Sequence, residues 1–325
     1  MKRSCGVAVA VLGVVACKVA PIPSSQAYPA GTQFQAVDRV IDGTRLRMID
    51  TGQGPAVVFL HGFGASIYSW RYQLAPVLDA GYRVIAVDLR GFGFSDRPDS
   101  GYTNADYVRL ALALMDTLGI SDAVLVGHSM GAAVAGEVAL TAPDRVRGLV
   151  LMAPAGCPPL PRELRWSFLA KLKIRLLSRG TVRKTLRHMF ADPALVTEAD
   201  VDQYYAPVVA PGAGSTLRRV ISTFRFDALC GRLGGLQVPT MVLWGAADHA
   251  IPFEAASRLA HELPRSAFIM VPKAGHNLQE EVANKVNRYL IDFLRNGLPE
   301  VPPDLAAAGH SSSGARSRPS RTRGD

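Results

Sequence analysis

The stretch Ala123-Val124-Leu125-Val126-Gly127-His128-Ser129-Met130-Gly131 decides how the rest of the 325-residue sequence is interpreted. It joins a short apolar run, which predicts a buried strand, to a following segment with helical spacing. A serine on such a sharp strand-to-helix turn needs glycines nearby, because larger side chains would clash there. The helix that begins at this point also directs N–H groups towards a developing negative charge. The pattern therefore predicts that Ser129 is a nucleophile at the end of a buried strand.

Short apolar runs of the same kind recur along the chain, each followed by a segment with helical spacing. Because they are continuously hydrophobic, they predict a mostly parallel sheet with helices on both faces, which is an α/β fold. Upstream, Phe34–Val40 and Thr44–Asp50 alternate apolar and polar residues around Asp42-Gly43, and this predicts an antiparallel hairpin. The predicted strands are Ala56–Leu60, Val84–Val87, Val124–Val126, Leu149–Met152, Met241–Trp244 and Phe268–Val271. The predicted helices are Trp70–Leu78, Asp106–Leu118, Ala132–Leu140, Glu254–Leu263 and Val282–Leu294.

The chain divides into five parts by composition. Residues 1–30 predict an export segment, residues 31–154 and 236–296 the two parts of the core, and residues 297–325 a disordered tail rich in Pro, Ser, Gly and Arg. Between 155 and 235 the alternation of strands and helices stops. Charged helical stretches there predict a helical insertion, which ends in a loop that contains Pro207, Pro211, Gly212 and Gly214.

Two further residues complete a possible catalytic triad. A serine hydroxyl is a weak nucleophile until a base takes its proton, so a histidine and an orienting carboxylate are expected. Asp248 follows the predicted strand Met241–Trp244, and His276 follows the predicted strand Phe268–Val271. Since parallel strands end at one edge of a sheet, Asp248 and His276 are predicted to meet Ser129 there.

These features together resemble the α/β-hydrolase superfamily, and in particular its capped branch. The resemblance covers Phe34 to Arg295 and implies an eight-stranded sheet with a helical cap inserted after the sixth strand. The residues that carry it are Leu60–Gly64, Asp88–Asp96, Gly127–Gly131, Trp244–Asp248 and Gly275-His276.

The resemblance also implies roles for individual residues. The backbone N–H groups of Phe63 and Met130 would form the oxyanion hole, and neither a metal nor an organic cofactor is implied. His61 would hold the loop after its strand, and His128 would shape the turn around the serine. Asp88 and Asp96 match a turn region in which structural hydrogen bonds, not acid–base work, are expected.

The identity of the residue at position 129, a serine, narrows the range of activities that the resemblance allows. Haloalkane dehalogenases and epoxide hydrolases of this branch use aspartate at the same position, so the resemblance leaves esterases and lipases, meta-cleavage-product (carbon–carbon bond) hydrolases, perhydrolases or haloperoxidases, and some amidases. A small-molecule ester is the favoured substrate, because an exported enzyme would not meet an intracellular aromatic intermediate. A non-catalytic ligand-binding protein of the same fold is the alternative from another class, although an intact triad favours an enzyme.

The first residues predict export. Lys2 and Arg3 precede an uncharged run, Gly6–Ala16, which suits a signal peptide but is too short to span a bilayer. Val14–Cys17 resembles the lipobox of bacterial lipoproteins, which would make Cys17 the lipid-bearing mature N-terminus. A plain secretory signal that is cleaved before Tyr28, or a short uncleaved anchor, remains open.

The net charge of +9 is concentrated in the predicted insertion. Apolar residues lie between these basic ones, which suits a membrane surface with anionic headgroups, while a solvated helix is the alternative. No nucleic-acid-binding module is present in the sequence. Cys157 and Cys230 lie near the two ends of the insertion and either pair or stay as buried thiols. Between residues 162 and 187 the one acidic residue is Glu163, and the basic residues are Arg162, Arg165, Lys171, Lys173, Arg175, Arg179, Arg183, Lys184 and Arg187.

Overall fold

The computed structural model describes residues 28, 31–155, 177–251, 256, 258–259, 262–263 and 265–298. The predicted lipid-bearing Cys17, the rest of the predicted export segment apart from Tyr28, Cys157 and nearly all of the predicted tail therefore lie outside the described residues. Five of the nine basic residues of the insertion, from Arg162 to Arg175, also lie outside them.

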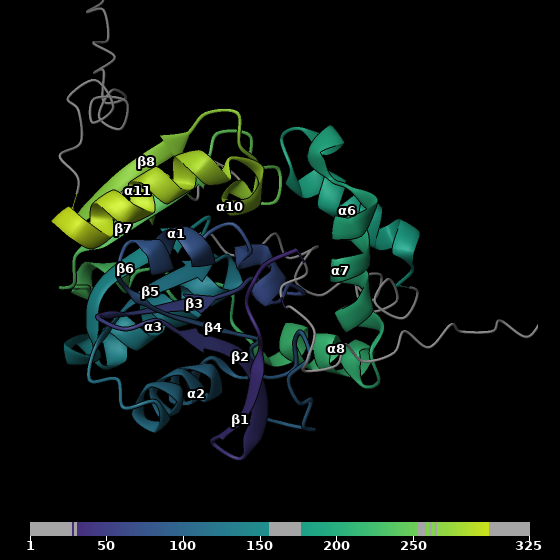
Figure 1. The fold of residues 1–325 in the computed structure, drawn as a ribbon, viewed down its shortest axis with the longest axis horizontal. Helices are drawn as coiled ribbons and strands as arrows, with labels where there is room; N and C mark the ends of the chain where they lie inside the picture. Colours follow the sequence, from purple (N-terminus) through teal and green to yellow (C-terminus); the bar gives the residue numbers. More distant parts are fainter. Residues whose placement is uncertain are drawn as a thin grey trace, which may run out of the picture.

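Eight strands form one sheet in the order β1-β2-β4-β3-β5-β6-β7-β8 (Figure 1). Strands β3 to β8 run parallel to one another, whereas β1 and β2 are antiparallel to each other and β2 is antiparallel to β4. The predicted mostly parallel, eight-stranded sheet is therefore confirmed. The strands are β1 (Val37–Ile41), β2 (Thr44–Thr51), β3 (Ala56–Leu60), β4 (Arg83–Val87), β5 (Ala123–His128), β6 (Val146–Met152), β7 (Thr240–Gly245) and β8 (Ser266–Val271).

The predicted hairpin is present. Ile41 pairs with Thr44 across a two-residue turn, and both turn residues have positive φ, 47° for Asp42 and 69° for Gly43. An aspartate–glycine pair favours this backbone, which explains why the hairpin could be found from local sequence.

Helices cover both faces of the sheet, and strand side chains divide between two buried clusters. One cluster joins alternate strand residues to α1 and α11, and the other joins the remaining ones to α2 and α3. The core is thus a three-layer arrangement with the sheet in the middle. The core helices are η1 (Ile67–Trp70), α1 (Leu74–Asp79), α2 (Asn104–Thr117), α3 (Met130–Thr141), η2 (Pro143–Arg145), α10 (Leu278–Glu281) and α11 (Ala283–Asn296).

Two predictions about the core differ from the structure. The predicted helix Trp70–Leu78 is two pieces, η1 and α1, because Pro76 lacks an N–H and its ring would clash with the carbonyl of Tyr72 in a continuous helix. The predicted buried strand at Phe268–Val271 is β8, whose residues alternate between buried and half-buried. It is an edge strand of the sheet, so it pairs with another strand on one side only.

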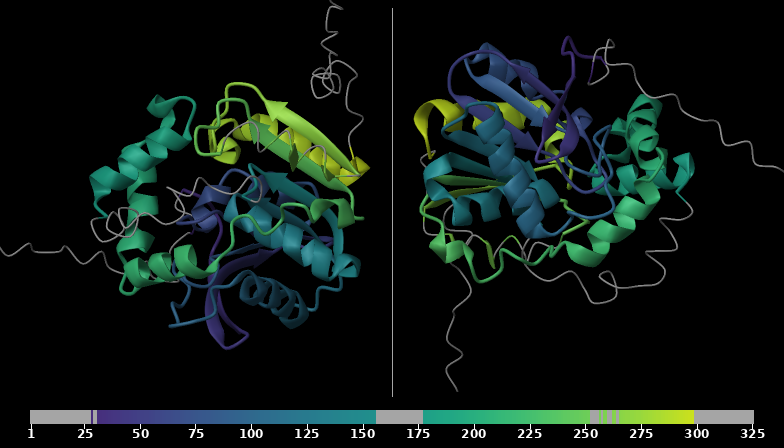
Figure 2. Two further views of the ribbon diagram at one scale, coloured as in Figure 1. Left: turned by 180° about the vertical axis from the view of Figure 1, so that it is seen from behind. Right: turned by 90° about the horizontal axis from the view of Figure 1, so that it is seen from below.

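Between β6 and β7 lies a helical region, and we call its described residues, 177–235, the cap. Residues 179–223 lie to one side of the layered core, beyond the carboxyl ends of the parallel strands (Figure 1 and Figure 2), whereas Leu229 and Leu233 pack into the core. Its elements are α6 (Arg179–Met189), η3 (Pro193–Leu195), α7 (Glu198–Val209), α8 (Ala213–Thr223) and η4 (Leu233–Gly235). Within the described part of the chain, no helix combines the length and apolar character needed to cross a bilayer.

The predicted loop in this region is confirmed only for Pro211 and Gly212. Pro207 lies inside α7 and Gly214 inside α8, and only a short turn with Gly212 at φ 81° separates the two helices. Pro207 costs α7 the hydrogen bond that its missing N–H would make to the carbonyl of Gln203, and the helix ends two residues later. Cys230, at the end of the cap, is disulfide-bonded.

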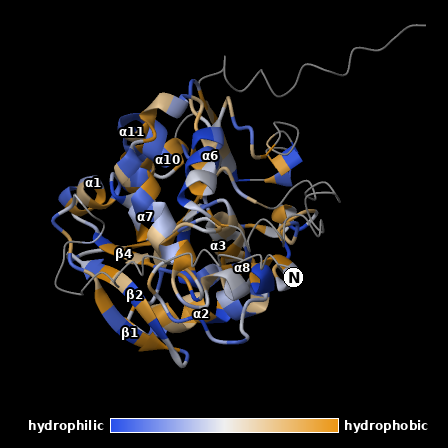
Figure 3. Ribbon diagram, turned by 90° about the vertical axis from the view of Figure 1, so that its right-hand side faces the viewer, coloured by the Kyte–Doolittle hydropathy of each residue, from blue (hydrophilic) through white to orange (hydrophobic). Residues whose placement is uncertain are grey.

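The surface of α6 is basic, although part of its charge is paired. Figure 3, in which this side faces the viewer, shows hydrophilic colour along α6. Arg179 contacts Asp202 at 2.6 Å, and Arg183 donates to the Glu198 carboxylate at 2.8 Å. Two of the four described basic residues of the 162–187 stretch are therefore offset by acidic residues of α7.

The first turn of α3 packs directly on the end of β3. A Cβ placed on Gly131 would lie 2.0 Å from the carbonyl oxygen of Leu60, and one on Gly127 would lie 2.5 Å from the Cα of Ala132. Only glycine permits these backbone contacts, so the two glycines of the predicted motif fix α3 against β3 and β5.

A buried histidine holds the loop that follows β3. His61 is fully buried, its Nδ1–H donates to the carbonyl of Gly62 at 2.8 Å, and its Nε2 accepts from the N–H of Leu89 at 3.0 Å. Burial lowers the pKa of His61 from 6.5 to about 4, so the ring is neutral at pH 7. The expected structural role of His61 is confirmed.

Asp88 and Asp96 also hold loops, as expected. Buried Asp88 accepts from the N–H groups of Ile67 and Phe94 at 2.7 and 2.8 Å, and burial raises its pKa to about 6. Asp96 accepts from the guanidinium of Arg45 at 2.7 Å.

We expect Gly131→Ala to lower the free energy of unfolding by about 3 kcal/mol or to prevent folding, because the new methyl would overlap backbone that cannot move aside. Gly180 is the matched control, since it is also the second residue of its helix but has no neighbour closer than 3.7 Å to an added Cβ. Gly180→Ala should leave stability unchanged or raise it by up to about 1 kcal/mol. Urea unfolding followed by circular dichroism measures both, and equal stabilities for wild type and Gly131→Ala would contradict the packing described.

His61 should make stability depend on pH. Its folded pKa of about 4 lies below the unfolded value of 6.5, so the stability that neutral His61 contributes is present above pH 6.5 and is lost as the pH falls towards 4. The variant His61→Gln has no proton to take up. The difference in free energy of unfolding between wild type and His61→Gln should therefore shrink by about 2 kcal/mol between pH 7 and pH 5. Urea titrations at both pH values test this. An unchanged difference would show that the protonation of His61 does not contribute to the pH dependence of stability.

Candidate active site

Ser129 occupies the turn between β5 and α3 in a backbone conformation that few residues adopt. Its φ is 51° and its ψ is −114°. The N–H of Ser129 donates to the carbonyl of Met152 at 2.9 Å, and its own carbonyl accepts from the N–H of Ala155 at 3.1 Å. Both partners belong to β6 or the residues just after it, so the neighbouring strand holds the strained turn.

Asp248 and His276 are joined by a hydrogen bond. The Nδ1–H of His276 donates to Asp248 Oδ2 at 2.9 Å, and Asp248 Oδ1 accepts from the N–H groups of Ala250 and Ile251 at 2.8 and 2.9 Å. Burial alone would raise the pKa of Asp248, but the hydrogen bond and charge of His276 and the two amides lower it below its usual value. A carboxylate held in this way fixes the orientation of the His276 ring. The carboxylate binds Nδ1 and leaves Nε2 without a bond to Asp248.

Ser129 and His276 line the same cavity. In the described part of the chain the Ser129 hydroxyl makes no hydrogen bond, including none to His276. Catalytic hydrogen bonds in free enzymes are often long and tighten when substrate binds. The structure thus brings the three predicted residues to one edge of the sheet, with Asp248 and His276 in direct contact.

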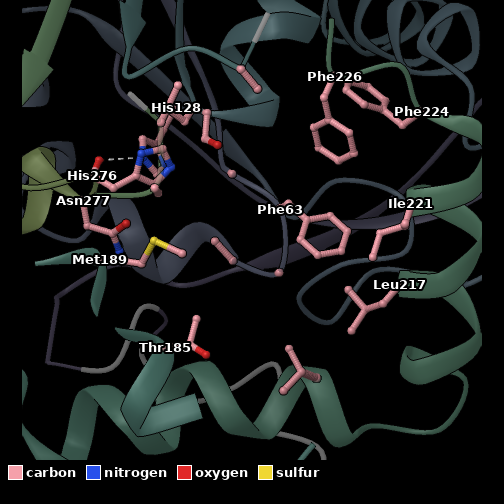
Figure 4. A pocket seen from close by; sticks show the side chains of 18 of the residues that line it. Phe63, His128, Thr185, Met189, Leu217, Ile221, Phe224, Phe226, His276 and Asn277 are labelled. Atoms are coloured by element: carbon pink, nitrogen blue, oxygen red, sulfur yellow. Dashed lines mark hydrogen bonds between the residues drawn. The ribbon is translucent and has the colours of Figure 1, made fainter. Parts of the chain in front are cut away.

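His128 supports the backbone of His276. Its Nε2–H donates to the carbonyl of His276 at 3.0 Å, drawn as the dashed line in Figure 4, and the two rings lie 4.9 Å apart between centroids. Burial, with the nearby His276, lowers the pKa of His128 to about 3, so this ring is neutral. Its Nδ1 lies beside Gly62 and has no hydrogen-bond partner among the described residues.

The two predicted oxyanion donors lie on either side of this turn. Met130 is the first residue of α3, and Phe63 follows Gly62, whose added Cβ would lie 3.3 Å from the Cβ of Ser129. Neither amide donates a hydrogen bond within the described residues. Both N–H groups are therefore available to a ligand, although their role as oxyanion donors stays a prediction.

The cavity has a volume of about 460 Å³ and lies between the core and the cap. In Figure 4, aromatic and aliphatic side chains gather on one side, opposite His276 and Asn277. These apolar side chains include Phe63, Leu217, Ile221, Phe224 and Phe226. Three cap residues on the other walls, Thr185, Met189 and Tyr204, were not found from the sequence, because no local pattern tells which helix face meets the core.

Few charges line this cavity. Apart from histidine, the charged residues among its described lining are Arg225 and Asp227, which approach each other to 3.4 Å. Elsewhere in the described chain, no group of three or more His, Cys, Asp or Glu side chains is arranged to hold a metal ion.

Comparison with known proteins agrees with this geometry. A family model described as "alpha/beta hydrolase fold" matches residues 55–283. The chain is 32% identical to a 2-hydroxy-6-oxo-6-phenylhexa-2,4-dienoate hydrolase of Burkholderia cepacia, over 80% of this chain and 94% of that protein. It is 31% identical to a 2-hydroxy-6-oxononadienedioate/2-hydroxy-6-oxononatrienedioate hydrolase of Comamonas testosteroni, with the same coverage. A solved meta-cleavage product hydrolase from Pseudomonas fluorescens IP01 superposes with a TM-score of 0.70 at 26% identity, over 80% of this chain and 97% of that one. The protein is therefore a hydrolase of the α/β-hydrolase family.

Proposed function

We propose that this hydrolase cleaves a carboxylic ester by means of a serine nucleophile, through an acyl-enzyme. The observation that supports this most strongly is the Asp248–His276 hydrogen bond beside a cavity that also contains Ser129. The three side chains come from three separate strand ends, those of β5, β7 and β8. They have the chemical types that acyl transfer by a serine nucleophile requires, and they occur in the chain order Ser, Asp, His of the α/β-hydrolase fold.

The proposed reaction has two steps. His276 Nε2 takes the proton of the Ser129 hydroxyl as Ser129 Oγ attacks the carbonyl carbon, and the amides of Phe63 and Met130 donate to the oxyanion. The carbon–oxygen bond to the alcohol breaks, and His276 returns its proton to the leaving alcohol. A water activated by His276 then releases the acid and restores Ser129.

The cavity suits a neutral, apolar substrate. Its walls are mostly aliphatic and aromatic, and its described cation, Arg225, already faces Asp227. Burying an unpaired carboxylate against such walls would be costly. The expected export of the chain points the same way, since it would separate the enzyme from intracellular aromatic intermediates. Export, lipidation of Cys17 and a membrane surface as partner stay predictions of the sequence.

Carbon–carbon bond hydrolysis is the second candidate, and the relatives favour it. Proteins 31% and 32% identical to this chain over 80% of its length are named as hydrolases of dienoates or dienedioates. Such substrates carry a carboxylate, which needs a cation or several donors to bind. Among the described residues of the cavity only Arg225 supplies a cation, and its side chain is 69% exposed.

We expect Ser129→Ala to lower turnover of p-nitrophenyl butyrate by about 10⁴- to 10⁶-fold, because the nucleophile is removed. Covalent labelling by a fluorophosphonate probe should be abolished as well. Ser222 is the matched control, since it lines the same cavity but donates its hydroxyl to the carbonyl of Arg218 at 2.5 Å. Ser222→Ala should be labelled like the wild type. A folded wild type that takes up no probe would identify a non-catalytic binding protein instead.

A comparison of substrates separates the two candidate reactions. Ester hydrolysis predicts that kcat/KM rises with acyl chain length on neutral p-nitrophenyl esters, because each added methylene is buried against apolar walls. Arg225→Gln should then change kcat/KM for these esters less than about twofold, since an exposed charge contributes little to a neutral ligand. Faster turnover of a ring-fission dienoate than of any ester, with KM raised by Arg225→Gln, would instead establish carbon–carbon hydrolysis.

A further inference from the structure

The loop that carries His276 is hydrogen-bonded to the cap. The N–H of His276 donates to the carbonyl of Met189 at 2.7 Å, and the N–H of Asn277 approaches the same oxygen at 3.4 Å. Met189 is the last residue of α6 and also lines the cavity. The backbone of His276 is therefore supported by a helix end of the cap as well as by the core.

Glu281 adds a second connection at the same place. Its Oε2 accepts from the N–H of Gly275 at 2.6 Å, and its Oε1 accepts from the N–H of Asp192 at 2.7 Å. One carboxylate thus joins the residue before His276 to a cap residue three positions after Met189. Hydrogen bonds to a carboxylate acceptor are stronger than those between neutral groups, so we expect both hydrogen bonds of Glu281 to be strong.

The two backbones lie in direct contact at this point. A Cβ on Gly275 would lie 2.4 Å from the carbonyl oxygen of Met189 and 2.7 Å from the nitrogen of Ala191. No side chain separates the His276 loop from the cap. A displacement of the segment 189–192 would therefore move the loop or break its hydrogen bonds.

Asn277, the residue after His276, is held by Glu280, the residue before Glu281. Glu280 accepts from the side-chain amide of Asn277 at 2.9 Å and from the hydroxyl of Tyr204 in α7, and it pairs with Arg71 of the core. Glu280 and Glu281 are consecutive in α10, and each contacts both the cap and a residue next to His276. The His276 loop is thus fixed to the cap on both sides.

We propose that Glu281 is a positioning residue that couples the seating of the cap to the placement of His276. This inference rests on the proposed function, because it concerns the reach of His276 towards Ser129. The Asp248 bond fixes the direction of the His276 ring, while the Gly275 and Met189 contacts fix where its backbone lies. Displacement of a catalytic group by about 1 Å can slow a reaction about 100-fold.

The variant Glu281→Gln tests this inference. Glutamine keeps the size of the side chain but replaces one acceptor oxygen with an NH₂ group, so one of the two amides loses its partner. We expect kcat for p-nitrophenyl butyrate to fall about 10- to 100-fold, with KM changed less than about twofold. The rate constant for fluorophosphonate labelling of Ser129 should fall by a similar factor.

Glu262→Gln is the matched control. Glu262 also accepts a hydrogen bond from a backbone amide, that of Gly231 at 3.0 Å, and makes no hydrogen bond or ion pair with the His276 loop among the described residues. Its glutamine variant should keep kcat and the labelling rate constant within about twofold of the wild type. Loss of activity in both variants to the same extent would overturn the role of Glu281.

The final extent of labelling distinguishes a positioning role of Glu281 from partial unfolding of the variant. A positioning role predicts complete but slow labelling of Glu281→Gln, whereas partial unfolding predicts incomplete labelling at the wild-type rate constant and overturns the inference. An unchanged rate constant with complete labelling would also overturn it while leaving the proposed function intact. Absence of labelling in the wild type would overturn both.

Discussion

The close approach of α3 to the ends of β3 and β5 is the contact on which the site depends. Because Gly127 and Gly131 have no side chains, the first turn of α3 lies against backbone, and Ser129 is held in a left-handed conformation at the carboxyl edge of the sheet. The same contact places the amide of Met130 beside the serine. Asp248 and His276 reach this edge from the ends of β7 and β8, so the parallel sheet supplies the meeting point.

Much of the core could be predicted because its signals are local. Asp42-Gly43 favours its turn whatever surrounds it, and continuously apolar runs identify strands that are covered on both sides. Predictions were wrong where proline acts according to its position in a helix. Pro76 divides a segment with helical spacing into η1 and α1, whereas Pro207 is accommodated near the end of α7. Composition alone does not separate these two cases.

The candidate site was predictable to the extent that it follows strand ends. Ser129, Asp248 and His276 each come after a recognisable apolar run, and parallel strands turn that order into proximity. The contacts of Glu281 have no such signal. Its partner Asp192 is 89 residues away in the chain, and the bond is to a backbone amide, which every residue except proline possesses. The cavity walls supplied by α6, α7 and α8 were hidden for the same reason.

The carbonyl of Met189 belongs to the cap by sequence and to the candidate active site by hydrogen bonding. A boundary drawn between cap and core at the ends of β6 and β7 therefore does not separate the walls of the cavity from the contacts that hold His276. Chimeras that exchange the whole region between β6 and β7 would replace the contacts that hold His276 together with many of the cavity walls. A transplant that retained residues 189–192 from the recipient would change the other cavity walls of the cap while leaving the contacts of the His276 loop in place.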